Sequence, residues 1–223
     1  MPTIQIVAPP LPARRHGLFS VAQPITVERF GIVQFKENCP GEINIAQDPC
    51  DTPVAKTTRS DSWSELEPFY AYSLTECGPF GEPVDGRPFH DQNLEYAFEV
   101  AANTLLTGTT NTEAATDIAD LIAKAAAHIG SVLFLPLATA VAANDYLDII
   151  DGDLYVKATG QPVTVSPAYT VAGVITGPMY HRDANPDVVE AFNTTTNQRY
   201  QLVEGMYAFG ASCEDGVVRI TVA

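Results

Sequence analysis

The longest helical pattern in the chain is Asp91-Gln-Asn-Leu-Glu-Tyr-Ala-Phe-Glu-Val-Ala-Ala-Asn-Thr-Leu-Leu-Thr-Gly108. Asp91 suits the N-cap position and Gly108 suits the end of a helix. Apolar residues recur within it at the helical period, which places them on one face: Leu94, Phe98, Ala101 and Leu105. The stretch therefore predicts one long helix with an apolar face against which the rest of the chain packs.

The region before this helix has the composition of strands and loops. Residues 36–90 are rich in Pro, Gly, Ser and Thr, and Val27–Phe35 has a β-like pattern. In Pro68-Phe-Tyr-Ala-Tyr-Ser-Leu74 aromatic residues alternate onto both faces, which predicts a strand covered on both sides. We interpret this region, which lacks a helix, as a long two-stranded excursion. Because an isolated β-ribbon is barely stable, we expect it to rest on another subunit.

A second helix and a series of short strands are predicted after the long helix. The helical pattern is carried by Ile118, Leu121, Ile122, Ala125 and Ile129, with Asn111 or Thr112 as the cap and Gly130 at the end. A buried strand over Ser131–Leu137 and a short helix over Ala138–Tyr146 follow, with turns at Asp151-Gly152 and Gly160-Gln-Pro162. The remaining predicted strands are Leu154–Lys157, Val163–Val165, Val171–Thr176, Gln198–Leu202, Met206–Ala211 and Val217–Val222. This order of elements predicts an α+β chain.

Charge is distributed unevenly along the 223 residues. The net charge is −15, yet residues 1–60 carry +1, while residues 61–90, 91–160 and 161–223 carry −5, −8 and −3. The first segment also holds the one basic cluster, Arg14-Arg15-His16, among several prolines that favour extended backbone. The acidic balance argues against tight binding of nucleic acid. A non-acidic, extended arm is expected to lie on the acidic body of a neighbouring copy, with a frayed terminus as the alternative.

The ends of the chain and its cysteines indicate a cellular compartment. No apolar run is long enough to span a membrane, and the N-terminus has no signal peptide pattern, so we expect synthesis in a cytoplasm. None of the four cysteines forms a C-x-x-C pair, which makes a zinc ribbon unexpected. Buried thiols are the first interpretation, and late disulfide formation is the second, with Cys39 and Cys50 as its best candidates. The four residues are Cys39, Cys50, Cys77 and Cys213.

Motifs for catalysis or cofactor binding are lacking in the sequence. It contains no dinucleotide or phosphate-binding glycine loop, no H-E-x-x-H and no G-x-S-x-G. The acidic run through Asp145, Asp148, Asp151 and Asp153 lacks the spacing of a calcium loop and is expected to be a solvated turn. No catalytic residue, metal ligand or cofactor is predicted.

Several segments, taken in order, resemble tailed-bacteriophage major capsid proteins of the Hong Kong 97-type fold, and more specifically capsid subunits of actinobacteriophages. The resemblance rests on the order in which these motifs occur. They are Gly17-Leu-Phe-Ser-Val-Ala22, Gly31-Ile-Val-Gln-Phe35, Cys39, Cys50, Pro68-Phe-Tyr70, Cys77-Gly78, Glu99-Val-Ala-Ala-Asn-Thr-Leu-Leu-Thr-Gly108, Val174-Ile-Thr-Gly-Pro178, Thr196-Asn197 and Tyr207-Ala-Phe-Gly-Ala-Ser-Cys213.

This resemblance implies a division of the chain. It consists of an N-terminal arm (1–28), a peripheral-domain strand with an extended β-hairpin called the E-loop (29–90), a spine helix in the peripheral domain (91–111), a small apical domain (112–190) and a return to peripheral-domain strands (191–223). The chain is short for the fold, so its apical domain is expected to be small. Since no charged helical prefix is present, a fused scaffolding segment is expected to be absent or separately encoded.

The resemblance also implies a function without catalysis. The chain is expected to self-assemble, as a hexamer or pentamer subunit, into the icosahedral shell of a virion around double-stranded DNA, with assembly in the host cytoplasm. Its partners would be copies of itself, a second capsid, scaffolding or decoration protein, and DNA only non-specifically, with no membrane. Expected assembly contacts are Arg14, Arg15, Lys36 and Lys56.

Three alternatives stay open at this point. The first is an encapsulin-like nanocompartment shell, which keeps the fold and changes the contents. The second is a tail-tube or decoration protein of a phage. The third is a thiol-dependent hydrolase that pairs a cysteine with His90, His128 or His181. The fourth histidine, His16, belongs to the basic cluster of the arm.

Overall fold

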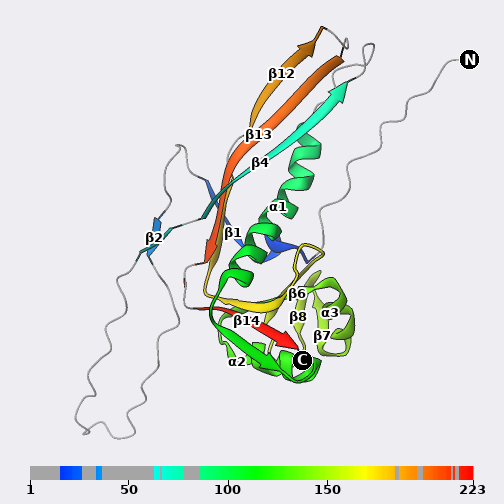
Figure 1. Ribbon diagram of the computed structural model, residues 1–223. Coiled ribbons are helices and arrows are strands. Elements are labelled where there is room, and N and C mark those ends of the chain that lie inside the picture. Colours follow the sequence, from blue (N-terminus) through cyan, green and yellow to red (C-terminus); the bar gives the residue numbers. More distant parts are fainter. Residues whose placement is uncertain are drawn as a thin grey trace, which may run out of the picture.

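Two β-sheets joined by one long helix make up the computed structural model of the protein (Figure 1). The structure describes residues 16–26, 34–36, 63–65, 67–77, 86–183, 186–194, 198–211, 213 and 216–222. The first sheet, called here the long sheet, is built around one 14-residue strand, β13 (Gln198–Ala211). Its other strands are β1 (Gln23–Thr26), β4 (Glu67–Cys77), β11 (Met179–Asp183) and β12 (Asp187–Asn193).

The second sheet has seven strands and forms the lower body in Figure 1. In spatial order they are β5 (Thr112–Ala115), β14 (Val217–Val222), β10 (Ala172–Thr176), β6 (Ser131–Pro136), β9 (Pro162–Ser166), β8 (Asp153–Val156) and β7 (Leu147–Ile150). The helices α2 (Ile118–Ala127) and α3 (Leu137–Ala142) pack against this sheet, and short 3-10 turns cover Leu18–Ser20 and Asn144–Tyr146. A small separate pair is formed by β2 (Gln34–Lys36) and β3 (Trp63–Glu65). The predicted α+β class is confirmed.

The long helix α1 runs from Arg87 to Gly108 and connects the two sheets. It begins four residues before the predicted start, because a proline in its first turn is compatible with helix geometry there. Its fully buried apolar residues are Phe98, Ala102 and Leu106, whereas Ala101 and Leu105 of the predicted face are only half-buried. The buried face therefore lies about one position further along the chain than the apolar pattern indicated.

The seven-stranded sheet is buried on both faces, and β6 shows how its sequence achieves this. Val132 and Phe134 face α1 and join a core that continues into the long sheet. Leu133 and Leu135 face the opposite way, into a core with α2 and α3. Successive side chains of a strand point to opposite faces, so an uninterrupted apolar run is what a doubly covered strand requires.

The second helix is shorter than predicted. Residues 112–115 form β5, which pairs in parallel with β14, so neither Asn111 nor Thr112 is the cap. The cap is Asp117, whose carboxylate accepts a hydrogen bond from the amide of Asp120 at 2.8 Å. Ile129 is 83% exposed, beyond the end of the helix, because the helix ends at Ala127. The helical pattern was correct only from Ile118 to Ala125.

Asp117→Ala tests this cap. The substitution leaves an amide at the start of α2 without its acceptor, so we expect a loss of about 0.5–2 kcal/mol in the free energy of unfolding. Chemical denaturation followed by circular dichroism measures it. Asp117→Ser should retain most of the stability, and an equal loss in both variants would contradict the role of the cap.

Every predicted strand after α3 is present, and β7, β11 and β12 are further strands that the sequence did not predict. β11 lies before residue 190 and β12 spans it, and both belong to the long sheet, whereas β14 lies after residue 190 and belongs to the seven-stranded sheet. Two predicted strands, over 198–202 and 206–211, are one strand, β13. Gly205 lies within this strand, and the ring of Tyr207 packs where a Cβ at that position would stand. A residue with a side chain would collide with the ring. The chain therefore crosses between the two sheets more than once, and the division of the chain at residue 190 stays a prediction.

Part of the predicted arm belongs to the body of the subunit. Leu18 and Ala22 are buried in the core, and β1 pairs in parallel with β11. Apolar residues in the short turn explain this, because they gain burial without needing a neighbouring copy. Residues 1–15, 27–33 and most of the predicted E-loop lie outside the described residues; from that loop the structure describes β2, β3 and β4.

Candidate functional site

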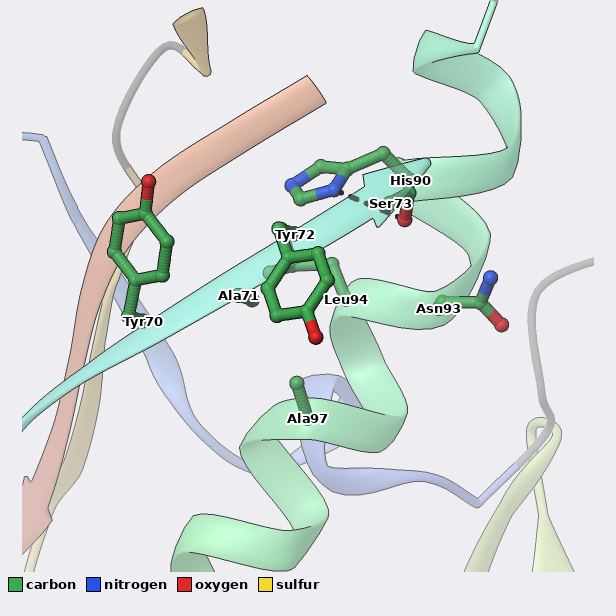
Figure 2. A pocket seen from close by; sticks show the side chains of 8 residues that line it. All are labelled: Tyr70, Ala71, Tyr72, Ser73, His90, Asn93, Leu94 and Ala97. Carbon is green, nitrogen blue, oxygen red and sulfur yellow. Dashed lines mark hydrogen bonds between the residues drawn. The ribbon is translucent and has the colours of Figure 1, made fainter. Parts of the chain in front are cut away.

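One face of the long sheet carries large apolar side chains that no described segment covers. On β4, Phe69, Ala71 and Ser73 face α1 and are half-buried, whereas the alternating residues Tyr70, Tyr72 and Leu74 are exposed. Figure 2 shows Tyr70 and Tyr72 at this strand. The sequence predicted cover on both faces of this strand, but within the described subunit only one face has it.

Strand pairing extends this exposed surface across the sheet. Residues directly opposite each other in antiparallel strands share a face, and β13 lies between β4 and β12. Leu74 lies opposite Leu202, which lies opposite Val189, and Tyr70 lies opposite Met206. We call the exposed set the outer patch; its members are between 43% and 68% exposed and are Tyr70, Tyr72, Leu74, Val189 and Met206.

Acidic residues lie within the outer patch. Tyr72 is opposite Glu204, and Glu204 is opposite Asp187. A hydrogen bond to Glu204 raises the pKa of Tyr70, with the charge of the carboxylate acting in the same direction. An exposed apolar surface of this kind, with acidic residues between its apolar members, is typical of a protein–protein contact.

The inner face of the same strands holds a buried histidine (Figure 2). Nε2 of His90 is 2.7 Å from the hydroxyl of Tyr207, and Nδ1 is 3.3 Å from Oγ of Ser73. A cavity of about 230 Å³ beside this group is lined by residues of β4 and α1, including Asn93 and Leu94. Burial lowers the pKa of His90 although Asp91 opposes the shift.

This arrangement lacks the parts of a nucleophilic site. In a serine or cysteine triad a third group, usually a carboxylate, orients and stabilises the charged imidazole. Here the ring nitrogens of His90 are occupied by a phenol and a weakly placed serine hydroxyl, and the lowered pKa keeps the ring neutral. We interpret the group as a polar connection between α1, β4 and β13.

The buried state of His90 predicts a dependence of stability on pH. Because the pKa is lower in the folded protein than in the unfolded chain, the unfolded chain binds the proton more readily, and stability decreases as pH falls through the ordinary histidine range near 6.5. Denaturation at pH 7.5 and pH 5.5 should show a larger drop for the native chain than for His90→Gln. Equal drops in the two proteins would contradict this assignment.

Two acidic residues of α1 are buried, which sequence reasoning missed. Glu99 is fully buried and accepts a hydrogen bond from Oγ of Ser166 on β9 at 2.5 Å. The carboxylate of Glu95 lies against Gly17, where a Cβ would overlap it. These residues hold the 3-10 turn and the seven-stranded sheet against α1. An acidic residue on a helix is ordinarily exposed, so no sequence signal distinguished them.

The structure does not bring the predicted site residues together. Arg14, Arg15, Cys39, Cys50 and Lys56 lie outside the described residues. The backbone of Lys36 pairs with Trp63, and that of Cys77 with Arg199; their side chains are not among those described. Cys213 is buried and disulfide-bonded. The assembly contacts and the other three cysteines stay predictions.

The four histidines have separate structural environments. Nε2 of His128 is 3.0 Å from Oε1 of Glu113, and the residue is the C-cap of α2. The ring of His181 stacks on Phe19 at 4.5 Å, and the carbonyl of His16 accepts a hydrogen bond from the amide of Val165. None of these contacts is with a cysteine.

In the described part of the chain, His, Cys, Asp and Glu side chains do not gather in groups of three or more able to hold a metal ion. No helix among the described residues has the length and apolar character to cross a membrane.

Comparison with solved structures identifies the fold. A chain from the "Capsid of native GTA particle computed with C5 symmetry" superposes with a TM-score of 0.62 at 9% identity, covering 100% of this chain and 95% of that one. A chain from Microbacterium phage Oxtober96 gives 0.57 at 12% identity, covering 100% and 96%. This chain has the Hong Kong 97-type capsid fold.

The same fold also occurs in a solved structure of an encapsulin. The holo-SrpI encapsulin complex from Synechococcus elongatus contains a chain with the same architecture, at a TM-score of 0.59 and 10% identity, covering 98% of this chain and 92% of that one. No protein-family model matches the sequence, and no curated protein matches it. Sequence comparison therefore adds no family, while the Hong Kong 97-type fold accounts for nearly the whole chain.

Proposed function

We propose that the protein is a structural subunit of a phage capsid, which self-assembles into a closed icosahedral shell around double-stranded DNA. The observation that carries the proposal is a Hong Kong 97-type fold over the whole chain, shared with chains from capsids at near-complete coverage of both. The role requires no catalysis, and the polar group around His90 fits structural packing. The virion is the proposed location.

The outer patch supports self-association. Five large apolar side chains on one sheet face are an unfavourable surface for an isolated subunit, and a second copy of the chain is their proposed partner. The acidic members Glu204 and Asp187 favour contact with a non-acidic segment of that copy, and residues 1–60, which include Lys36 and Lys56, are the only segment without net negative charge. Closed shells arise when such contacts repeat around rotation axes.

An encapsulin-like shell is the second candidate, because one structural neighbour is an encapsulin complex. The contents of the assembled particles distinguish the two functions. Particles purified from cells that express this chain with its co-encoded virion proteins should protect double-stranded DNA from nuclease. Particles that enclose an enzyme and no DNA would favour the encapsulin function and contradict the proposed one.

A further inference from the structure

A groove opens on the seven-stranded sheet, whereas the outer patch lies on the long sheet. It lies between α3 and the strands β7, β8 and β9, has a volume of about 560 Å³ and is mainly apolar. Leu137, Val141 and Ile149 line it and are between 54% and 71% exposed, so they form a second uncovered apolar surface. Its deeper lining consists of Ala140, Leu147, Leu154 and Val165.

The N-terminal segment begins at the rim of this groove. His16 lines the groove, and its carbonyl accepts hydrogen bonds from the amide of Val165 at 3.0 Å and from Oγ1 of Thr164 at 3.1 Å. Its φ of 64° is in the left-handed region, which turns the chain at this point. Nδ1 of His16 is buried and has no hydrogen-bond partner in the described part of the chain. A buried polar atom of this kind indicates a missing partner.

Residues 1–15 have the composition that this groove would accept. Residues 3–12 are Thr-Ile-Gln-Ile-Val-Ala-Pro-Pro-Leu-Pro, an apolar sequence with three prolines that favour extended backbone. Ten extended residues reach roughly 33 Å, more than enough to cross an opening of this volume. Arg14 and Arg15 precede His16 directly, and Asp148 lies in the groove wall, with Asp145, Asp151 and Asp153 nearby in sequence. The charges are therefore complementary.

We propose that this groove is the docking site of residues 3–12 of the same chain. Ile4, Ile6 and Leu11 would cover the exposed apolar wall, and a polar group of the segment would satisfy His16. Because the segment is tethered at the rim, its effective concentration is far higher than that of a second copy. The acidic partner of the arm is then its own subunit instead of the neighbour that the sequence suggested. The inference holds whether or not the protein forms a shell.

Hydrogen exchange on the full-length chain tests the docking. Ile4→Asp, Ile6→Asp and Leu11→Asp, introduced together, should increase exchange of amides in residues 137–150 by about tenfold, because the apolar contacts are lost. Peptides from β4 should be unaffected. Thr3→Asp with Gln5→Asp adds charge to the same segment without removing apolar side chains and should change exchange in 137–150 much less. Identical exchange in the triple variant and the native chain would overturn the proposal.

Photo-crosslinking distinguishes docking of the segment in the groove of its own chain from docking in the groove of a second copy. A benzoylphenylalanine at position 6, irradiated in an equal mixture of 15N-labelled and unlabelled protein, should give crosslinks to residues 137–150 within isotopically pure chains. Adding Val141→Asp should reduce their yield. Crosslinks between labelled and unlabelled chains would show a neighbouring copy in the groove, and crosslinks elsewhere would show another site; either result overturns the proposal.

Discussion

Tyr72→Asp combined with Leu74→Asp is expected to abolish particle formation while leaving the subunit folded. Both side chains are mostly exposed in the subunit and belong to neither hydrophobic core, so the cores should not be affected. Burying one such side chain contributes about 1.5–3 kcal/mol. Losing two contacts should weaken each subunit interface by about 10²- to 10⁴-fold, and the loss repeats at every copy.

The measurement is sedimentation velocity on assembly reactions, with circular dichroism and thermal unfolding of the separated subunits. Ile129→Asp is the matched control, because Ile129 is also an exposed apolar residue but lies at the turn after α2, away from the long sheet. It should assemble like the native chain. Normal particles from the double variant would contradict the role of the outer patch.

Phe98→Ala is expected to cause the largest loss of stability of any single substitution considered. Phe98 is fully buried on α1, and its ring centroid lies between 4.9 and 5.8 Å from those of four other rings. Removing a buried phenylalanine costs about 3–5 kcal/mol, a large share of the roughly 5–15 kcal/mol that stabilises a typical domain. The four rings belong to Phe19, Phe69, His181 and Tyr207.

Urea denaturation of the purified subunit measures this loss. Phe19→Ala removes a ring from the same cluster, but Phe19 is on the surface of the 3-10 turn, so its loss should be clearly smaller. A similar loss in both variants would show that the cluster is not organised around Phe98.

Sequence patterns correctly predicted the elements whose structure depends on local residues alone. The strand β6 was predictable because both its faces are buried and Val132–Leu135 is an uninterrupted apolar run. The β7–β8 hairpin was predictable because Asp151 and Gly152 both adopt positive φ at its turn. The start of α2 was misplaced because Glu113 near a possible cap resembles a first helical turn. Only pairing with β14, about a hundred residues away in the chain, makes Thr112–Ala115 a strand.

The candidate surfaces were harder to predict, because each depends on which face of an element is covered. The alternation over Phe69–Leu74 was visible in the sequence, but the sequence could not show that α1 covers only one side. Burial of Glu95 and Glu99 likewise depends on Gly17 and Ser166, which come from distant parts of the chain. The groove at α3 depends on His16 lying beside Val165, a contact that no local pattern encodes.

Negative-stain electron microscopy is the most direct test of the central claim that this chain builds a shell. The chain should be expressed alone and together with its co-encoded virion proteins, and both preparations should be imaged. Closed shells or capsomer rings are the expected result. A monodisperse monomer that joins no particle in either preparation would contradict it.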